Sequence, residues 1–187
     1  MKTLTQKLAL LLMVVLFTAA CSNNNHETDK AAQQAQTLKD NAMKVMAMFE
    51  SGNPEGCEEY MHTDFTEHTP WPGVEGEGSE LFKNIVKTHY AGMSDTKMTV
   101  HNISVDGDYM YIHYNMKGTH NGDGWPGMPA TNKTIDVDGV DVLKHRDGKV
   151  SDHWGYMDQF KMMTQLGMMP EPGAEGAPAD SAATTSN

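Results

Sequence analysis

The amino-acid sequence predicts an α+β fold in which helices come first and antiparallel strands follow. Apolar residues recur at intervals of three and four over 38–49 and over 79–92, which indicates two amphipathic helices. After residue 95 the period changes to two, which indicates strands. Asp106-Gly107 and Asp147-Gly148 are hairpin turn signals within that second part. Helices followed by hairpin-connected strands predict a curved sheet with helices on one face.

The first helix is expected to end at Ser51-Gly52-Asn53-Pro54, because Gly and Pro interrupt helices. A short helical piece should follow near 54–61, and 64–68 should be extended or irregular. The apolar face of the first helix contains Leu38, Ala42, Val45, Met46 and Phe49. The apolar face of the second helix contains Leu81, Phe82, Ile85, Val86, His89, Tyr90 and Met93.

Four strands are expected near 96–105, 108–120, 132–146 and 149–157, with a Gly- and Pro-rich loop at 121–131 and a last helix near 159–166. One side of the second strand carries Met110, Ile112, Tyr114 and Met116. The other side carries Tyr109, Tyr111, His113, Asn115 and Lys117. That second side is amphipathic, so we expect it to be solvated or to form a homodimer interface.

Both ends of the chain are predicted to lie outside the folded domain, which should span 36–169. Residues 1–20 have the basic start, short apolar run and small residues of a signal peptide. Cys21 resembles the acylated cysteine of a bacterial lipobox, although ordinary cleavage after Ala20 also fits. Residues 21–35 then form a flexible tether, and 170–187 form a disordered tail. These features predict a cell-envelope protein, lipid-anchored to a bacterial membrane on its periplasmic or outer-membrane side.

Composition excludes some classes of partner. The 187 residues include 14 Lys and Arg against 25 Asp and Glu, a net charge of −11, which argues against nucleic acid as a partner.

The nine His and 16 Met raise the question of whether the protein binds copper. Met also fills irregular cores, however, and the His residues lack metal-binding spacings. We therefore expect neither a metal nor a cofactor. If Cys21 is acylated, Cys57 has no disulfide partner.

Six motifs occur in a recognisable order along the expected domain. They are Glu67-His68-Thr69-Pro70, Gly118-Thr119-His120, Gly127-Met128-Pro129-Ala130-Thr131, Gly139-Val140-Asp141, the segment 147–154 and Gln165-Leu166-Gly167. In order and spacing they resemble the SnoaL-like polyketide cyclase or ester cyclase family, within the nuclear transport factor 2-like superfamily.

The resemblance implies a cone-shaped fold with an apolar pocket at its wide end, and often a homodimer through the outer sheet face. It also implies an intramolecular aldol condensation without metal or cofactor, with an Asp as acid and base. The position that matches this Asp is Gly155 here, and Asp158 lies three residues further on.

Three residues are the catalytic candidates. Asp141 shares the apolar parity of its strand, where a poorly solvated carboxylate suits proton transfer, although it could also be paired for structure alone. His120 continues the inward parity of Tyr114 and should lie at the pocket mouth, where it could shuttle protons or fix the following loop. His68 belongs to a matching motif and could point into the same space.

The remaining candidates are pocket-lining residues rather than catalysts. His89 lies on the core side of its helix, so a satisfied or pocket-lining histidine is expected there. His153 and Trp154 alternate on the last strand, and parity does not decide which faces inward. The predicted lining is Trp71, His89, Tyr114, Met128, His153, Trp154 and Asp158.

Three functional hypotheses follow for a small apolar or carbonyl-containing ligand. The first is an enzyme that isomerises, cyclises or hydrolyses its ligand by acid–base chemistry. The second is a non-catalytic module that binds a ligand at the envelope. The third is an interaction protein that uses the outer sheet face to form dimers or a larger assembly.

Overall fold

The computed structural model describes residues 28–170. The expected signal peptide, the lipidation site Cys21 and residues 171–187 of the expected tail lie outside the described residues. A helix occupies 28–51. It is followed by η1 (Cys57–Glu59), β1 (Met61–Glu67), α2 (Gly78–Gly92), β2 (Lys97–Asp106), β3 (Tyr109–Thr119), β4 (Thr134–Arg146), β5 (Lys149–Met157) and α3 (Gln159–Gln165).

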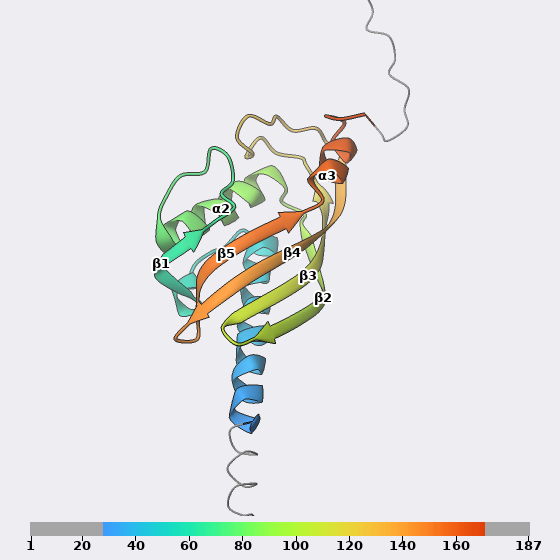
Figure 1. Cartoon of the computed structure of the whole chain (residues 1–187). Coiled ribbons are helices and arrows are strands. Elements are labelled where there is room, and N and C mark those ends of the chain that lie inside the picture. Colours follow the sequence, from blue (N-terminus) through green and yellow to red (C-terminus); the bar gives the residue numbers. More distant parts are fainter. Residues whose placement is uncertain (1–27, 171–187) are drawn as a thin grey trace, which may run out of the picture.

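The strands form one curved sheet in the order β1-β5-β4-β3-β2 (Figure 1). The pairs from β2 to β5 are antiparallel and form the expected meander. Asp147 and Gly148 both have positive φ, as a two-residue type I′ hairpin turn requires. β1 is an addition to the prediction, since the segment expected to be extended pairs in parallel with β5. The α+β prediction is confirmed.

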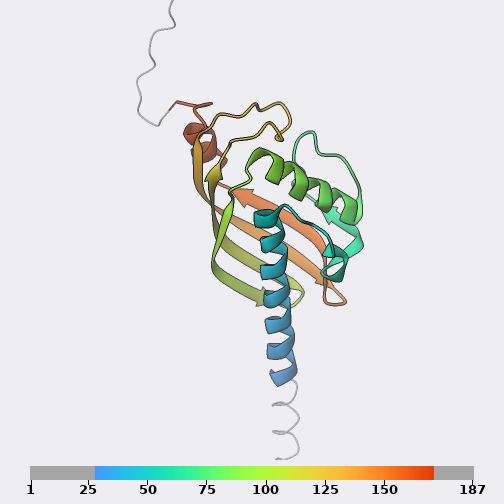
Figure 2. The same ribbon diagram turned by 180° about the vertical axis from the view of Figure 1, so that it is seen from behind.

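Both long helices lie against the same, concave face of the sheet, as seen from behind in Figure 2. The predicted apolar side of β3 is buried there, and the other side is largely exposed. From α2, the buried side chains Phe82, Ile85, Val86 and His89 enter the core. Tyr90, expected on the core side, is exposed instead, and its ring lies where a side chain on Gly52 would be.

The first helix begins earlier than the prediction. Residues 28–35, assigned to a flexible tether, are helical and extend beyond the sheet (Figures 1 and 2). Ala31, Ala32, Gln33 and Gln34 are exposed and favour helix by intrinsic propensity, which explains their helical conformation. Among the described residues, no helix is long and apolar enough to cross a membrane.

Close glycine contacts fix the long loop after β3 against the end of α2. A side chain on Gly122 or Gly124 would overlap the backbone of Ala91, and one on Gly92 would lie 2.5 Å from Trp125 Nε1. The loop therefore places the buried Trp125 indole against the C-terminal end of α2.

Candidate functional site

The concave face of the sheet and the helices enclose a cavity of about 730 Å³. Its lining is mainly apolar, and none of its residues is Lys or Arg. Seven methionines contribute to it, namely Met46, Met61, Met98, Met116, Met128, Met157 and Met162. Such a lining suits an apolar ligand, because thioether side chains adapt to irregular shapes.

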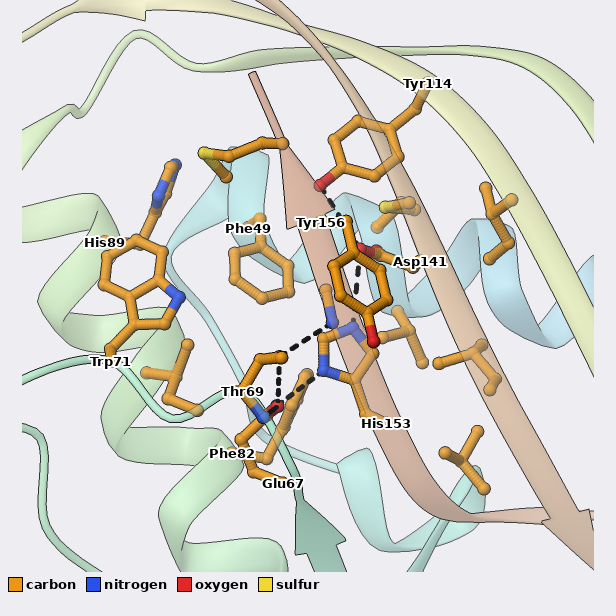
Figure 3. A pocket seen from close by; sticks show the side chains of 18 of the residues that line it. Phe49, Glu67, Thr69, Trp71, Phe82, His89, Tyr114, Asp141, His153 and Tyr156 are labelled. Carbon is orange, nitrogen blue, oxygen red and sulfur yellow. Dashed lines mark hydrogen bonds and ion pairs between the residues drawn. The ribbon is translucent and has the colours of Figure 1, made fainter. Parts of the chain in front are cut away.

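An aromatic wall forms the side of the cavity next to α2. Trp71 lies edge-on to both Trp125 and His89, with ring centroids 5.8 Å apart in each pair. Phe49 is edge-on to the His89 ring at 5.5 Å. In Figure 3 the Trp71 and His89 side chains lie on the opposite side of the cavity from Tyr114 and Asp141.

A charged cluster lies on the sheet side, where the cavity is otherwise apolar. His153 Nδ1 is 2.5 Å from Glu67 Oε2, and its Nε2 is 3.4 Å from Asp141 Oδ1. The imidazole of β5 thus stands between a carboxylate of β1 and a carboxylate of β4 (Figure 3). The Tyr114 hydroxyl donates to Asp141 Oδ1 at 3.3 Å.

Glu67 is the most fixed member of this cluster, with only 4% of its side chain exposed. Its Oε1 accepts hydrogen bonds from the backbone N–H and the hydroxyl of Thr69, both at 2.8 Å. The Thr69 Oγ1 in turn accepts from the Gly155 N–H at 2.7 Å. These bonds tie the end of β1 to β5 and hold the Glu67 carboxylate in one orientation against His153.

The two carboxylates determine the charge of His153. Burial alone disfavours the imidazolium, but hydrogen bonds and charge attraction from Asp141 and Glu67 outweigh it and raise the pKa of His153 to about 10. Burial likewise opposes the ionised form of Glu67, yet the bonds to His153 and Thr69 lower the pKa of that carboxyl overall. At neutral pH His153 is therefore an imidazolium and Glu67 a carboxylate.

Strand register places Asp141 beside the position where the resemblance expects an acid. Asp141 on β4 is directly opposite Gly155 on β5. A Cβ on Gly155 would lie 3.4 Å from Asp141 Oδ1 and 3.1 Å from His153 Cε1. The Asp141 carboxylate thus lies next to the space that a side chain at 155 would enter, and the missing side chain leaves room for it.

Comparison with known proteins identifies the protein family of this chain. The family model of the SnoaL-like polyketide cyclases matches residues 40–166. The chain belongs to this family. A search of curated proteins finds no significant match.

Solved structures agree with the fold of this SnoaL-like domain. TsrD from Streptomyces laurentii has a TM-score of 0.63 at 24% identity, over 73% of this chain and 97% of that one. IdmH from Streptomyces antibioticus has a TM-score of 0.59 at 24% identity, over 70% and 98%. AclR from Streptomyces galilaeus has a TM-score of 0.60 at 19% identity, over 73% and 85%. At such identities these likenesses show the fold alone.

Six of the predicted site residues of the SnoaL-like domain line the cavity together. They are Trp71, His89, Tyr114, Met128, Asp141 and His153. Structure also resolves the open choice on β5, because His153 is in the lining and Trp154 is not. Trp154 stacks on His68 with ring centroids 4.2 Å apart. Since neighbouring residues of a strand face opposite sides, this stack lies on the outer side of the sheet.

Three further predictions of position differ from the structure. His68 is exposed and bonds to Asp152 at 2.9 Å, outside the cavity lining. His120 is fully buried behind the lining, where its ring stacks on Trp125 at 4.6 Å, and it is not at the pocket mouth. Asp158 caps α3 by accepting from the Lys161 N–H at 2.9 Å. The side chains of the three bond elsewhere and form no hydrogen bond or ion pair with the side chains of the charged cluster.

Glu67 and Thr69 are site residues that the sequence analysis did not select. Both belong to the motif Glu67-His68-Thr69-Pro70, of which only His68 was predicted to be a site residue. An alternating strand would have pointed Glu67 and Thr69 to the face opposite His68.

Among the described residues, no group of three or more His, Cys, Asp or Glu side chains is arranged to hold a metal ion.

Proposed function

We propose that this SnoaL-like domain catalyses acid–base isomerisation or cyclisation of a small, mostly apolar carbonyl compound, with Asp141 as the base. The observation that carries this proposal is the Asp141–His153–Glu67 cluster within an apolar cavity. The family supports a small-molecule ligand. The lining, which has no Lys or Arg, is suited to an uncharged one.

Proton abstraction next to a carbonyl group is the first step that this geometry supports. The Asp141 carboxylate takes a proton from the α-carbon, so a C–H bond breaks and an O–H bond forms on Asp141. The electron pair of the broken bond moves onto the carbonyl oxygen and gives an enolate. Asp141 is 16% exposed in this position, which leaves it reachable from the cavity.

Two donors next to Asp141 can stabilise the enolate. In the resting state the Tyr114 O–H donates to Asp141 Oδ1, and His153 Nε2 forms an ion pair with the same oxygen. Once Asp141 carries the proton, its attraction for both donors weakens, and they are free to turn to the enolate oxygen. Glu67 does not contact the substrate in this scheme; it is a positioning residue that keeps His153 charged and oriented.

The second half of the reaction depends on the substrate. In an isomerisation, Asp141 returns the proton to a different carbon. In a cyclisation, the enolate carbon attacks a second carbonyl of the same molecule, a C–C bond forms, and the new alkoxide takes the proton. Neither reaction requires an external oxidant or reductant.

Exchange of α-protons tests the base directly. We would measure by NMR the rate at which the full-length protein exchanges the α-protons of 2-tetralone in D₂O. Asp141→Asn should lower the enzyme-dependent rate by about 10²- to 10⁴-fold. Asp138→Asn is the matched control, because Asp138 is on the same strand but exposed on the outer face. An unchanged rate in Asp141→Asn contradicts the proposal.

A non-catalytic ligand-binding protein is the second candidate, and Gly155 at the family's acid position is the observation that favours it. The same experiment separates the two. Binding of 2-tetralone by the parent protein without any acceleration of exchange would establish binding and overturn catalysis.

We further propose that the domain is exported and held at the bacterial cell envelope by acylation of Cys21. The support is the sequence of 1–21. Cys21→Ala should leave the membrane fraction, whereas Cys57→Ala should remain there, because Cys57 is a buried free thiol of the folded domain. A Cys21→Ala protein that stays with the membrane is anchored in another way.

A homodimer through the outer sheet face is proposed as well. The exposed side chains Tyr109, Tyr111 and Val140 lie on the neighbouring strands β3 and β4 of that face. Tyr111→Lys should give monomers in analytical ultracentrifugation, whereas Tyr90→Lys on α2 should not alter the assembly. A Tyr111→Lys protein that still dimerises would rule out this face.

A further inference from the structure

The charged cluster occupies only one part of the cavity, and the lining continues beyond it towards the β4–β5 hairpin. On β4, Asp141, Leu143 and His145 alternate along the strand, and all three contribute to the lining. On β5 the lining extends from Gly148, just before the strand, to Met157 at its end. Figure 1 shows this hairpin at the end of the sheet opposite α3. The cavity is therefore elongated along the strands.

The part of the cavity between the cluster and the hairpin is an apolar section. Aliphatic, thioether and phenyl side chains from the first helix, β1, β4 and β5 line it, namely Val45, Met46, Met61, Phe65, Leu143 and Val150. All of these except Val45 are buried. Glu67 and Asp141, the carboxylates of the lining, both belong to the cluster. A flexible alkyl chain suits this section, because its walls adapt in shape and offer no hydrogen bonds.

Polar side chains line the far end of the apolar section. His145 pairs with Val150, whose N–H donates to the Tyr60 carbonyl at 2.8 Å. Lys44 of the first helix lies over the Tyr60 ring, 5.2 Å from its centroid, which brings Asn41 of the same helix to this end. Asn41, Tyr60 and His145 all contribute to the lining. A methylene group pressed against them would displace water without replacing its hydrogen bonds, so the apolar section has a defined length.

Strand geometry gives that length. Asp141 and His145 are four residues apart on β4, which corresponds to about 13 Å at about 3.3 Å per residue. An extended alkyl chain advances about 1.3 Å per carbon–carbon bond of about 1.5 Å. An alkyl chain of about ten carbons therefore fits between the charged cluster and the polar far end.

We propose that the ligand is a neutral carbonyl compound with an unbranched alkyl chain of about ten carbons. Its carbonyl group lies at the Asp141–His153 cluster, and its chain extends towards the β4–β5 hairpin. A ketone or an ester fits better than a fatty acid, because a carboxylate would face Asp141 and Glu67 in a lining without Lys or Arg. The inference rests on the proposed function, since it names the substrate class of the same cavity.

A series of methyl ketones tests the length of the apolar section. Equilibrium dialysis with the full-length protein at pH 7 gives the Kd of 2-heptanone, 2-nonanone, 2-undecanone, 2-tridecanone and 2-pentadecanone. Up to 2-undecanone, each further pair of methylenes should tighten binding about tenfold, because the added carbons are buried in the section. 2-Pentadecanone should bind no more tightly than 2-tridecanone, since its chain is longer than the section.

Two variants block the apolar section from the first helix. Ala42 is buried and contributes to the lining, so Ala42→Phe places a ring where the chain would lie. It should leave the Kd of 2-heptanone within about twofold of the parent and weaken binding of 2-undecanone about tenfold or more. Val45→Phe blocks the same section from the next turn of the helix and should act alike. Ala47→Phe, on the exposed side of this helix, is the matched control and should bind every ketone as the parent does.

The inference is wrong if the affinity of the parent is independent of chain length or still rises from 2-tridecanone to 2-pentadecanone. It is also wrong if the blocking variants, shown to be folded by circular dichroism, keep the parent's preference for 2-undecanone over 2-heptanone. Asp141→Asn should retain the dependence on chain length, because it leaves the apolar section unchanged. Exchange of 2-tetralone protons tests the reaction separately, so failure of catalysis and failure of the chain-binding section are distinguishable.

Discussion

Each of the two walls of the cavity presents a histidine, and the two histidines differ in charge. Burial disfavours the protonated ring in both. On the α2 wall nothing opposes this, and the pKa of His89 falls to about 4. On the sheet wall two carboxylates reverse it, and the pKa of His153 rises to about 10. Fixed neighbouring charges, rather than depth, decide which histidine is ionised.

This difference gives the two walls of the cavity different chemical properties. The sheet wall holds three charged groups in contact and is suited to moving protons. The α2 wall holds neutral aromatic rings and is suited to packing against a flat apolar group. In the proposed reaction, the ligand would react at the sheet wall and pack against the α2 wall.

Removing the charge from the sheet wall is the strongest way to break this comparison. His153→Gln leaves the carboxylates of Glu67 and Asp141, which are 4% and 16% exposed, without their cation, so the free energy of unfolding should fall by about 3–5 kcal/mol. Urea denaturation measures it. His113→Gln, exposed on the outer face of β3, should stay within about 0.5 kcal/mol of the parent. Equal stability of both variants would show that the cluster is not an ion triad.

Titration should sharpen the comparison, because the two walls respond at opposite ends of the pH range. The raised pKa of His153 gives stability that is full below about 6.5 and is lost as pH rises through about 10. The lowered pKa of His89 gives stability that is present above about 6.5 and is lost as pH falls through about 4.

The stability difference between the parent and His153→Gln isolates the first effect, since most other groups titrate alike in both. It should shrink by at most about 1.4 kcal/mol per pH unit between pH 6.5 and 10. Urea denaturation across that range measures it, and a difference independent of pH would contradict a charged His153.

Substitutions at the aromatic wall should lower the free energy of unfolding less than His153→Gln does, and Gly92→Ala tests this. Alanine usually stabilises helices relative to glycine by up to about 1 kcal/mol. Here its Cβ would overlap the Trp125 indole, so we expect a loss of about 1–3 kcal/mol instead. Lys87→Ala on the exposed side of α2 is the control. A stabilised Gly92→Ala protein would show that Trp125 is free to move.

Local patterns in the sequence were sufficient for much of this architecture. Alternation along β3 and β4 placed Tyr114 and Asp141 on the inner face, because side-chain direction in a strand has a period of two. The same reasoning failed for His120, since β3 ends at Thr119 and the chain turns there. Parity could not choose between His153 and Trp154 while the neighbouring strands were unknown.

Contacts between distant segments could not be predicted in this way. β1 pairs with β5, although more than 80 residues separate Glu67 from its partner His153. Nothing local to Glu67 announces a histidine partner. The same applies to the Asp141–Gly155 register, because pairing between β4 and β5 determines it. This pairing places the Asp141 carboxylate beside a position of β5 that carries no side chain.

The methionine lining has a consequence for the chemical durability of the protein. Thioethers oxidise to sulfoxides, which are polar and bulkier than the parent side chains. Seven such groups surround the cavity, so an oxidant that reached it would convert an apolar container into a hydrated one without breaking the chain. The domain would keep its backbone and lose the apolar surface that the proposed function requires, and reduction of the sulfoxides would restore that surface.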